Sequence, residues 1–182
     1  MPSYLLQLIY FLLPAGFANM APVLVKRYFK KINYPLDFKK SFNGKRILGD
    51  HKTVRGLIFG IIFAIVIALI QEYLFQHTIY FKELSLIDYS INYSLIVGLL
   101  MGTGALIGDA VKSFFKRQAG VKPGESFMPF DQIDWIVGAV IFIIPIYLIS
   151  LKDFFILLLL YFVIHLIVRG IAYIMGLTKK AV

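Results

Sequence analysis

Three aspartates and four cations gather in one stretch of the chain, Gly108 to Asp134, which lies between two strongly apolar segments. The aspartates are Asp109, Asp131 and Asp134, and the bases are Lys112, Lys116, Arg117 and Lys122. Carboxylate oxygens are the ligands that Mg²⁺ prefers. Lys and Arg bind phosphate oxygens through charge-assisted hydrogen bonds. The stretch therefore predicts a site for an anionic substrate and a divalent metal, at the edge of a membrane.

Asp109 closes an apolar segment, and its position needs a compensating positive charge. If the helix continues past Gly108, the spacing places one set of polar residues on a single face: Asp109, Lys112, Ser113, Lys116 and Arg117. A charged residue at the centre of a membrane helix costs about 2.5–3.5 kcal/mol, and less near the interface. An ion pair with Lys112 or Lys116 would offset part of that cost. A bound cation would do the same, and the chemistry favours the cation.

Asp131 and Asp134 are three residues apart, directly before the next apolar segment, so they share a face once a helix begins. Acids near a helix N-terminus are stabilising whatever the function, and capping alone would explain this pair. Together with Asp109, however, they supply three carboxylates from two neighbouring helix ends. We therefore predict that these three residues form the metal site, with a turn-rich loop between them.

An earlier basic segment, Phe42 to Gly56, carries a second set of anion-binding features. Asn43 and Gly44 form a turn signal. Thr53 can cap the helix that follows, leaving helical N–H groups exposed as an anion site. The nearby cations are Lys45, Arg46, Lys52 and Arg55. A solvated basic loop bound to lipid headgroups is the alternative interpretation.

The elements that position these residues are membrane helices. The chain has 182 residues, 59% of them hydrophobic, with a mean hydropathy of +0.80. Apolar runs of about 20 residues, enough to cross a bilayer, recur along it. We predict an all-α integral membrane protein of one domain, residues 1–182, with cytoplasmic loops at 26–54 and 109–132. The five predicted spans are 4–25, 55–75, 91–108, 133–150 and 154–176.

The distribution of Lys and Arg predicts the orientation of these spans. All 19 lie on one side of the predicted bundle except Lys82 and Lys152. Cytoplasmic loops are enriched in Lys and Arg, so the N-terminus is predicted outside, the C-terminus in the cytoplasm and the polar site at the cytoplasmic interface. The net charge of +9 thus reflects topology in the cell membrane, and nucleic-acid binding is not expected.

Two further patterns concern how the helices pack. In the third span, Gly98 and Gly102 are four residues apart, as are Gly104 and Gly108, a spacing that lets helices approach closely. A phosphate-binding loop is excluded there, because no strand precedes the glycines and no helix N-terminus follows. In the first span, Pro14 and Pro22 predict a kink or a break.

The polar motifs resemble a known family. Gly108-Asp109, Ser113, Lys116-Arg117, Gly120, Lys122 and Asp131-x-x-Asp134 are similar to the signature of the membrane CTP:phosphatidate cytidylyltransferases. The small size and the block Gly49-Asp50-x-Lys52-Thr53-x-Arg55-Gly56 resemble more specifically the archaeal branch, the CDP-archaeol synthases. Two departures favour that branch: Gln132 and Ile133 replace the usual Arg-x, and Met128-Pro129-Phe130 replaces His-Gly-Gly.

The resemblance implies Mg²⁺-dependent transfer of a cytidylyl group from CTP to a lipid phosphate, 2,3-bis-O-(geranylgeranyl)-sn-glycerol 1-phosphate, with release of pyrophosphate. It implies Mg²⁺ ligands at Asp109, Asp131 and Asp134, with Lys116 and Arg117 as further catalytic residues. Substrate contacts are then expected from Asn43, Lys45, Asp50, Lys52, Thr53, Arg55, Lys112, Ser113 and Lys122. The lipid tails are expected to enter sideways between helices, with the first span as one wall.

Other functions stay open on the sequence alone. A diacyl phosphatidate could be the lipid substrate instead. A small membrane transporter or an anionic-lipid-binding protein would use the same charges differently. Transport is disfavoured, because no Asp or Glu lies well inside a predicted span and Glu72 is near an outer end. The oligomeric state is open, a homodimer included.

Overall fold

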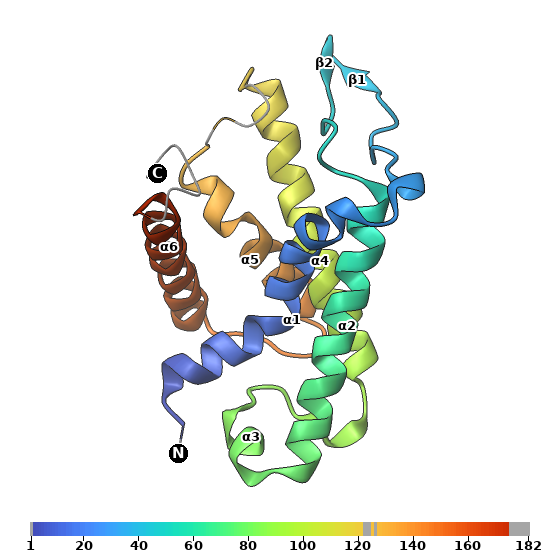
Figure 1. Cartoon of the computed structure of the whole chain (residues 1–182). Coiled ribbons are helices and arrows are strands. Elements are labelled where there is room, and N and C mark those ends of the chain that lie inside the picture. Colours follow the sequence, from blue (N-terminus) through green and yellow to red (C-terminus); the bar gives the residue numbers. More distant parts are fainter. Residues whose placement is uncertain (1, 122–124, 126, 175–182) are drawn as a thin grey trace.

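The computed structural model describes residues 2–121, 125 and 127–174. Lys122 and residues 175 and 176 of the fifth predicted span lie outside the described residues. The described part is mostly helical (Figure 1). Its elements, in chain order, are α1 (Tyr4–Leu24), η1 (Val25–Arg27), η2 (Lys30–Ile32), β1 (Ser41–Phe42), β2 (Lys45–Arg46), α2 (Val54–His77), α3 (Ile79–Leu84), η3 (Tyr89–Ile91), α4 (Ser94–Gln118), α5 (Phe130–Ile143) and α6 (Leu151–Ile174).

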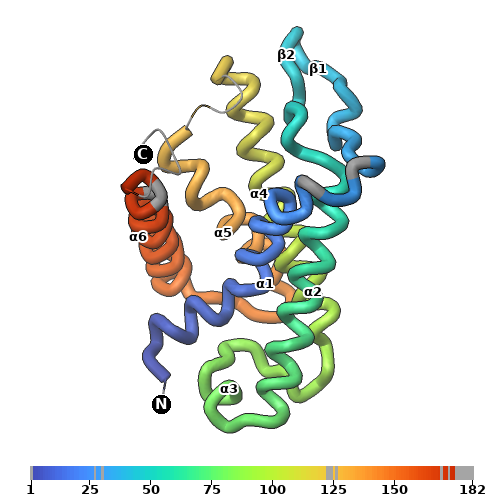
Figure 2. The backbone as a smooth tube through the Cα atoms, in the orientation of Figure 1, coloured from blue at the N-terminus to red at the C-terminus, as the bar shows by residue number. Residues whose placement is uncertain are grey.

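Four of the described helices are long and apolar enough to cross a membrane: α1, α2, α4 and α6. The fourth predicted span differs, because its helix α5 has only 14 residues, about 21 Å at 1.5 Å per residue. A hydrocarbon core is about 30 Å thick. Pro145 follows the end of α5 and lacks the N–H that would continue the helix. Residues 144–150 instead run without helical structure to the start of α6 (Figure 2).

The first predicted span is kinked but not broken. α1 is one continuous helix with Pro14 and Pro22 inside it. Figures 1 and 2 show that its axis changes direction part-way along its length. A proline inside a helix removes one backbone hydrogen bond and bends the axis.

The helix of the third predicted span continues past Gly108, as predicted, and the candidate site depends on this continuation. α4 begins at Ser94 and runs to Gln118, with Lys116 and Arg117 in its last turn. The Glu72 carboxylate accepts a hydrogen bond from the Ser94 N–H (3.0 Å) at the start of α4. The acids and bases that follow Gly108 are therefore carried on the same rigid element as the membrane-embedded part.

The four glycines of α4 face two different helices, as close packing requires. A Cβ on Gly98 would lie 2.5 Å from the Ile65 Cα of α2, and one on Gly102 2.7 Å from the Ala64 Cβ. On the other side, a Cβ on Gly104 would lie 2.5 Å from the Gly138 carbonyl oxygen of α5. The predicted packing role is confirmed. It makes α4 the central helix, in backbone contact with both α2 and α5.

The loop between α1 and α2 contains a hairpin that the all-α prediction did not include. β1 and β2 pair antiparallel, with Ser41 opposite Arg46 and Phe42 opposite Lys45. The turn predicted at Asn43 and Gly44 is confirmed, since these residues have φ of 49° and 74°, the left-handed values of a tight hairpin turn. At two residues per strand, the hairpin is a local feature of a helical protein.

Candidate active site

A single ammonium group joins the three predicted carboxylates. Lys112 Nζ lies 3.2 Å from Asp109 Oδ1, 2.9 Å from Asp131 Oδ1 and 3.0 Å from Asp134 Oδ2. Lys116 Nζ lies 3.0 Å from Asp131 Oδ2. Lys52, from the segment before α2, pairs with Asp109. The three acids therefore lie together, as the sequence predicts, and are matched by three lysines.

Helix geometry explains why these residues meet. Asp109, Lys112 and Lys116 follow one face of α4, while Asp131 and Asp134 occupy one face of the first two turns of α5. The Asp131 carboxylate also accepts a hydrogen bond from the Phe127 N–H (2.6 Å), which holds it at the helix start. Asp131 thus both joins the cluster and holds the segment before α5, although no side chain caps that helix.

The donor set suits a hard divalent cation, but a lysine lies among its members. Within residues 2–121, 125 and 127–174, no three acidic or histidine side chains are arranged to hold a metal ion. The oxygens are nevertheless of the type that Mg²⁺ binds. Asp134 Oδ2 is buried and contacts Lys112, yet it accepts no hydrogen bond of acceptable geometry. The carboxylates are therefore the right type of ligand for a metal ion. Binding one would require the Lys112 ammonium to move.

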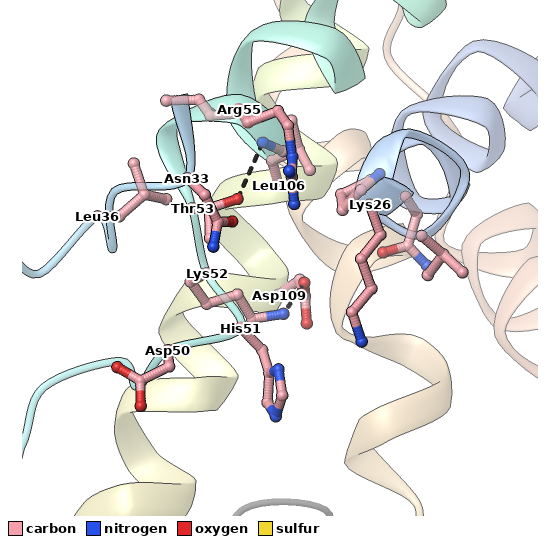
Figure 3. A pocket seen from close by; sticks show the side chains of 15 residues that line it. Lys26, Asn33, Leu36, Asp50, His51, Lys52, Thr53, Arg55, Leu106 and Asp109 are labelled. Atoms are coloured by element: carbon pink, nitrogen blue, oxygen red, sulfur yellow. Dashed lines mark hydrogen bonds and ion pairs between the residues drawn. The ribbon is translucent and has the colours of Figure 1, made fainter. Parts of the chain in front are cut away.

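A polar cavity of about 740 Å³ opens beside this cluster. Figure 3 shows Lys52 and Asp109 in contact on one side of it and Lys26 reaching in from another. Its walls come from α1, the segment before α2, α2 itself and α4. The lining residues are Asn19, Pro22, Val23, Lys26, Asn33, Leu36, Asp50, His51, Lys52, Thr53, Arg55, Gly56, Leu57, Leu106 and Asp109.

Thr53 and Arg55 both line the cavity, but both also have structural contacts. The Thr53 hydroxyl accepts from the Gly56 N–H (3.1 Å), which confirms the predicted cap. Arg55 is 5% exposed and donates to the Tyr28 carbonyl oxygen (3.0 Å). Arg55 therefore connects the segment after α1 to the start of α2. The prediction of Arg55 as a phosphate ligand did not include this contact.

Other predicted substrate contacts lie away from the cavity or face backbone groups. Asn43 is exposed at the hairpin turn, and Lys45 Nζ donates to the Gln118 carbonyl oxygen at the end of α4 (2.5 Å). The Ser113 hydroxyl donates to the Asp109 carbonyl oxygen (2.8 Å). Arg117 does not line the cavity, although its side chain approaches Gly49. Asp50 does line it and pairs with Arg46 (3.1 Å).

The structure adds residues that the sequence reasoning missed. Lys26, Asn19, Asn33 and His51 line the cavity. Asn19 lies inside an apolar helix beside Pro22, and a polar side chain at such a position was the signal available for it. Nothing in its local pattern distinguishes Lys26 from the other lysines of the basic loop.

Asp37 was also not predicted from the sequence. It does not line the cavity, but it organises the loop between α1 and α2. Its side chain is fully buried. The carboxylate accepts from Arg46 (2.9 and 3.2 Å) and from the N–H groups of Leu48, Gly49 and Lys39 (each 3.0 Å). Burial alone would raise the pKa of Asp37, but the hydrogen bonds from Arg46 and the backbone outweigh it and hold that pKa well below its usual range. Asp37 thereby fixes the segment that leads to Lys52.

These features define a class of protein: a helical membrane enzyme with a polar cavity beside a buried cluster of acids and lysines. A profile of the CDP-archaeol synthase (CarS-like) family matches residues 1–181. The CDP-archaeol synthase of Methanococcus maripaludis strain C7 is 38% identical over 176 residues, which cover 96% of this chain and 95% of the relative. That of Pyrococcus furiosus is 33% identical over 170 residues, or 93% of each chain. The chain belongs to the CDP-archaeol synthase family.

A solved structure shares the fold. It is described as an intramembrane enzyme for archaeal membrane lipids biosynthesis and superposes with a TM-score of 0.70 at 24% identity, covering 88% of this chain and 91% of the other. The family resemblance seen in the sequence is therefore confirmed. Family membership makes the chain an enzyme, a cytidylyltransferase of lipid synthesis. Nucleotidyl transfer of this kind generally involves a divalent metal.

Proposed function

We propose that this chain transfers the cytidylyl group of CTP to 2,3-bis-O-(geranylgeranyl)-sn-glycerol 1-phosphate, giving CDP-archaeol and pyrophosphate. One observation carries the proposal: Lys112 contacts all three carboxylates at 2.9–3.2 Å, directly beside a polar cavity lined by lysines. Acids and bases in equal number suit a reaction between two polyanions and a metal. An anion-binding surface alone would not require the acids.

The chemistry joins two groups that repel each other. An oxygen of the lipid phosphate attacks the α-phosphorus of CTP, and the bond from that phosphorus to the bridging oxygen breaks. Pyrophosphate leaves with the electron pair. No general base is needed, since the attacking phosphate is already ionised near neutral pH. Catalysis therefore depends on alignment and on charge neutralisation, for which Lys26 and Lys52 at the cavity and Lys112 and Lys116 at the cluster are placed.

Mg²⁺ is the metal that we assign to this site, with Asp109, Asp131 and Asp134 as its ligands. When bound, it would neutralise phosphate charge and polarise the phosphorus–oxygen bonds. The carboxylates are now balanced by three lysines, so an additional divalent cation would leave the cluster positive. A triphosphate that arrives with the metal supplies the matching negative charge. We therefore expect metal and nucleotide to bind together, with Lys112 turning from the carboxylates to a phosphate.

We place the site at the cytoplasmic interface of the cell membrane, where CTP is available. This placement follows the predicted orientation, in which the basic segment before α2 and the end of α4 face the cytoplasm. It also counts α5 with residues 144–150 as a fifth crossing. The four long helices support a membrane protein, and the orientation rests on the distribution of Lys and Arg.

Purified protein tests the proposal directly. Radiolabelled CTP, Mg²⁺ and either the geranylgeranyl diether phosphate or a diacyl phosphatidate are supplied in micelles, and CDP-lipid and pyrophosphate are measured. We expect CDP-lipid from the diether in equal amount to pyrophosphate, and at least about tenfold less from the diacyl lipid. A preference for phosphatidate would move the assignment to the diacyl substrate. No CDP-lipid from either lipid would overturn the proposed reaction.

A further inference from the structure

Two prolines inside α1 leave carbonyl oxygens without their usual helical donors. In an α-helix each N–H bonds the carbonyl oxygen four residues earlier, and proline has no N–H. Pro14 therefore frees the carbonyl oxygen of Tyr10, and Pro22 frees that of Ala18. Tyr10 and Ala18 are both buried, at 8% and 0% exposed. Within a membrane the partners of such carbonyls must come from the protein, because the lipid supplies no donor.

Gln71 of α2 supplies the donor for the first of these carbonyls. Its Nε2 donates to the Tyr10 carbonyl oxygen (2.6 Å), and its Oε1 accepts from the Tyr89 hydroxyl (3.0 Å). A carbonyl oxygen only accepts, so the amide nitrogen is the end of Gln71 that must face α1. Gln71 is 3% and Tyr89 1% exposed. Both polar ends of a buried amide are thus paired, and one of them holds the backbone at the kink.

The position of Gln71 in α2 makes this contact unusual. It follows a run of apolar residues, 57–70, in a helix long enough to cross a membrane. Polar side chains are costly in membrane helices and are found where they have a partner in the protein. An apolar side chain at this position would leave the Tyr10 carbonyl oxygen unpaired. The requirement for Gln71 therefore arises from Pro14, on another helix.

At the second proline, the backbone of α2 lies against α1. A Cβ on Gly60 would lie 2.9 Å from the Ala18 carbonyl oxygen, and a Cβ on Gly56 would lie 3.1 Å from the Pro22 Cβ. Glycine has no side chain that could donate, so these contacts set the separation of the helices and not the direction of α1. Gln71 provides a directional bond to α1 and therefore restrains its bend.

The part of α1 beyond Pro14 forms one wall of the polar cavity. Asn19, Pro22 and Val23 line the cavity, and Lys26 follows in η1 and reaches into it (Figure 3). Val23 lies about 13 Å beyond Pro14 along the helix, so a change of about 10° in the kink would move it by about 2 Å. A displacement of about 1 Å in a group that positions a substrate can lower the rate about a hundredfold. The geometry of this wall therefore depends on the kink.

We propose that Gln71 is a positioning residue for the polar cavity: it holds the kink of α1 through the Tyr10 carbonyl oxygen and thereby places the wall at Asn19 and Lys26. Gln71 does not line the cavity, and it lies about 21 Å farther along α2 than Leu57, which does. Its effect on the reaction therefore passes through α1. The kinetic test rests on the proposed function, in which this cavity receives CTP.

Gln71→Leu removes the donor and keeps most of the side-chain volume. We expect KM for CTP to rise about tenfold, because the α1 wall shifts. We expect kcat at saturating CTP to change by less than about twofold, since Asp109 and Lys112 lie on α4. A purely structural role would lower the active fraction, and with it kcat, and would leave KM unchanged. A wild-type KM for CTP would therefore overturn the proposal.

Gln76→Leu is the matched control. It makes the same change on the same helix, but Gln76 is exposed and its amide donates to Asn92 Oδ1 (2.6 Å) instead of to α1. KM and kcat should keep their wild-type values. An equal rise in KM for both variants would reject a specific role for Gln71.

Pro14→Ala tests the route from Gln71 to the cavity. The alanine N–H can donate to the Tyr10 carbonyl oxygen, so Gln71 is no longer needed there. Losing the kink should itself raise KM for CTP about tenfold, and adding Gln71→Leu should raise it by less than about twofold more. A wild-type KM in Pro14→Ala would show that the wall does not depend on the kink. Independent effects, about a hundredfold together, would show that Gln71 does not act through this carbonyl.

A distance measurement tests the bend without turnover. The chain contains no cysteine, so spin labels can be attached at Met20→Cys in α1 and Ile96→Cys in α4, both exposed positions. In Gln71→Leu we expect a wider distribution of distances with its mean shifted by about 2 Å, and in Gln76→Leu the wild-type distribution. Unchanged distances would overturn the proposal. Absence of CDP-lipid from the wild-type protein would instead overturn the proposed function, and the distances would still decide the role of Gln71 in the bend.

Tyr89→Phe keeps the proposal testable if Gln71→Leu does not fold. It removes only the hydroxyl that orients the Gln71 amide and leaves the ring in the core. The loss of one hydrogen bond should raise KM for CTP about threefold and widen the same distance distribution. Wild-type values for both would overturn the proposal.

Discussion

Lys112 is the residue on which the candidate site depends most, because it touches every carboxylate of the cluster. Buried charges are stable in a protein when they are paired and hydrogen-bonded. The Lys112 side chain is 14% exposed and those of Asp109, Asp131 and Asp134 are 16%, 20% and 6% exposed. Lys112 is thus the counter-ion of the three carboxylates, and under the proposed function we expect a second, separable role for it as a phosphate contact during reaction.

Lys112→Gln should lose both roles. Removing one partner of a buried ion pair costs about 3–5 kcal/mol, so the unfolding temperature, followed by tryptophan fluorescence, should fall. The double variant Lys112→Gln with Asp134→Asn removes the excess negative charge and should recover most of the stability without recovering CDP-lipid synthesis. If the double variant regains activity as well, Lys112 is a structural counter-ion only and Asp134 is not a metal ligand.

Asp109→Asn tests the acids independently of the lysine. Loss of one charged group in a catalytic site typically lowers kcat by about a hundredfold or more, and we expect that loss with the detergent-solubilised protein still folded. Asp88→Asn is the control, because Asp88 accepts a hydrogen bond from the Ser90 N–H and does not line the polar cavity. Full activity of Asp109→Asn would remove this residue from the metal site.

The site residues show what the local pattern can and cannot predict. The grouping of Asp109, Asp131 and Asp134 was predictable, since periodicity fixes which residues share a helix face and two consecutive helices end at the same interface. An ion pair between Asp109 and Lys112 was also among the alternatives that the spacing allowed. The contacts of Lys112 with Asp131 and Asp134 were not predicted, because a helix face sets direction but not the contacts of a long side chain. Lys26 and His51 reach the cavity through loop geometry, which no periodicity encodes.

At the scale of elements, α4 and α5 form the closest helix contact in the described part of the molecule, judged by the distance from a Cβ added at each glycine to its nearest neighbour. Gly138→Ala places a methyl group 2.1 Å from the Gly104 carbonyl oxygen, so the helices must separate. Overpacking of this kind costs about 1–3 kcal/mol, and the separation would move Asp134 from Lys112. We expect a lower unfolding temperature, measured by tryptophan fluorescence, and reduced activity, measured by CDP-lipid synthesis.

Gly170→Ala is the matched control for that variant. Gly170 lies in α6, and nothing would lie within 4 Å of its added Cβ. Alanine is favoured over glycine inside a helix by about 0.8–1 kcal/mol, so this change should leave stability equal or slightly higher. Equal destabilisation by both variants would show that the α4–α5 contact is not the cause.

The loop before α2 depends on the ionised form of Asp37. Its pKa is lowered in the folded protein, so its stabilising effect is complete above the unfolded value of about 3.9 and is lost as pH falls below that value toward the folded pKa. Amide exchange of residues 39–49 should therefore be constant from about pH 8 to 5, apart from intrinsic rates, and increase below about pH 4.

Asp37→Asn should produce the same increase in amide exchange at neutral pH. The asparagine keeps one acceptor but loses the charge that binds Arg46, and hydrogen bonds to a charged group contribute about 1.5–3 kcal/mol. Faster exchange of the Leu48 and Gly49 amides, with α2 unaffected, is the expected result. Unchanged exchange at pH 7 would contradict the anchoring role of Asp37.

At the scale of the whole molecule, each of the five predicted spans contains one helix, in the predicted order. Only four of the described helices are long and apolar enough to cross a membrane, and the difference lies in α5. Hydropathy detects apolar segments but does not show where a helix stops inside one. Residues 133–150 are apolar almost throughout, yet the helix ends at Ile143. The small hairpin was also missed, because two-residue strands held by a buried Asp37 leave almost no pattern in the sequence.

The absence of cysteine from the chain makes its orientation testable with single substitutions. Lys40→Cys lies exposed in the basic loop and Lys82→Cys lies exposed at the opposite end, in α3. In intact cells an impermeant maleimide should label Lys82→Cys and should label Lys40→Cys only after permeabilisation. The reverse pattern would place the candidate site outside and remove its access to cytoplasmic CTP.

The pairing of Asp109 with Lys112 has a consequence for how the protein is made. The two residues belong to the same helix, one turn apart, with their charged groups 3.2 Å from each other. During synthesis α4 emerges before α5, so Asp131 and Asp134 do not yet lie beside Asp109 when α4 enters the bilayer. The acid of α4 then already has a partner of opposite charge on its own helix, which lowers the cost of insertion. The translocon can therefore release α4 without waiting for the helix that completes the cluster.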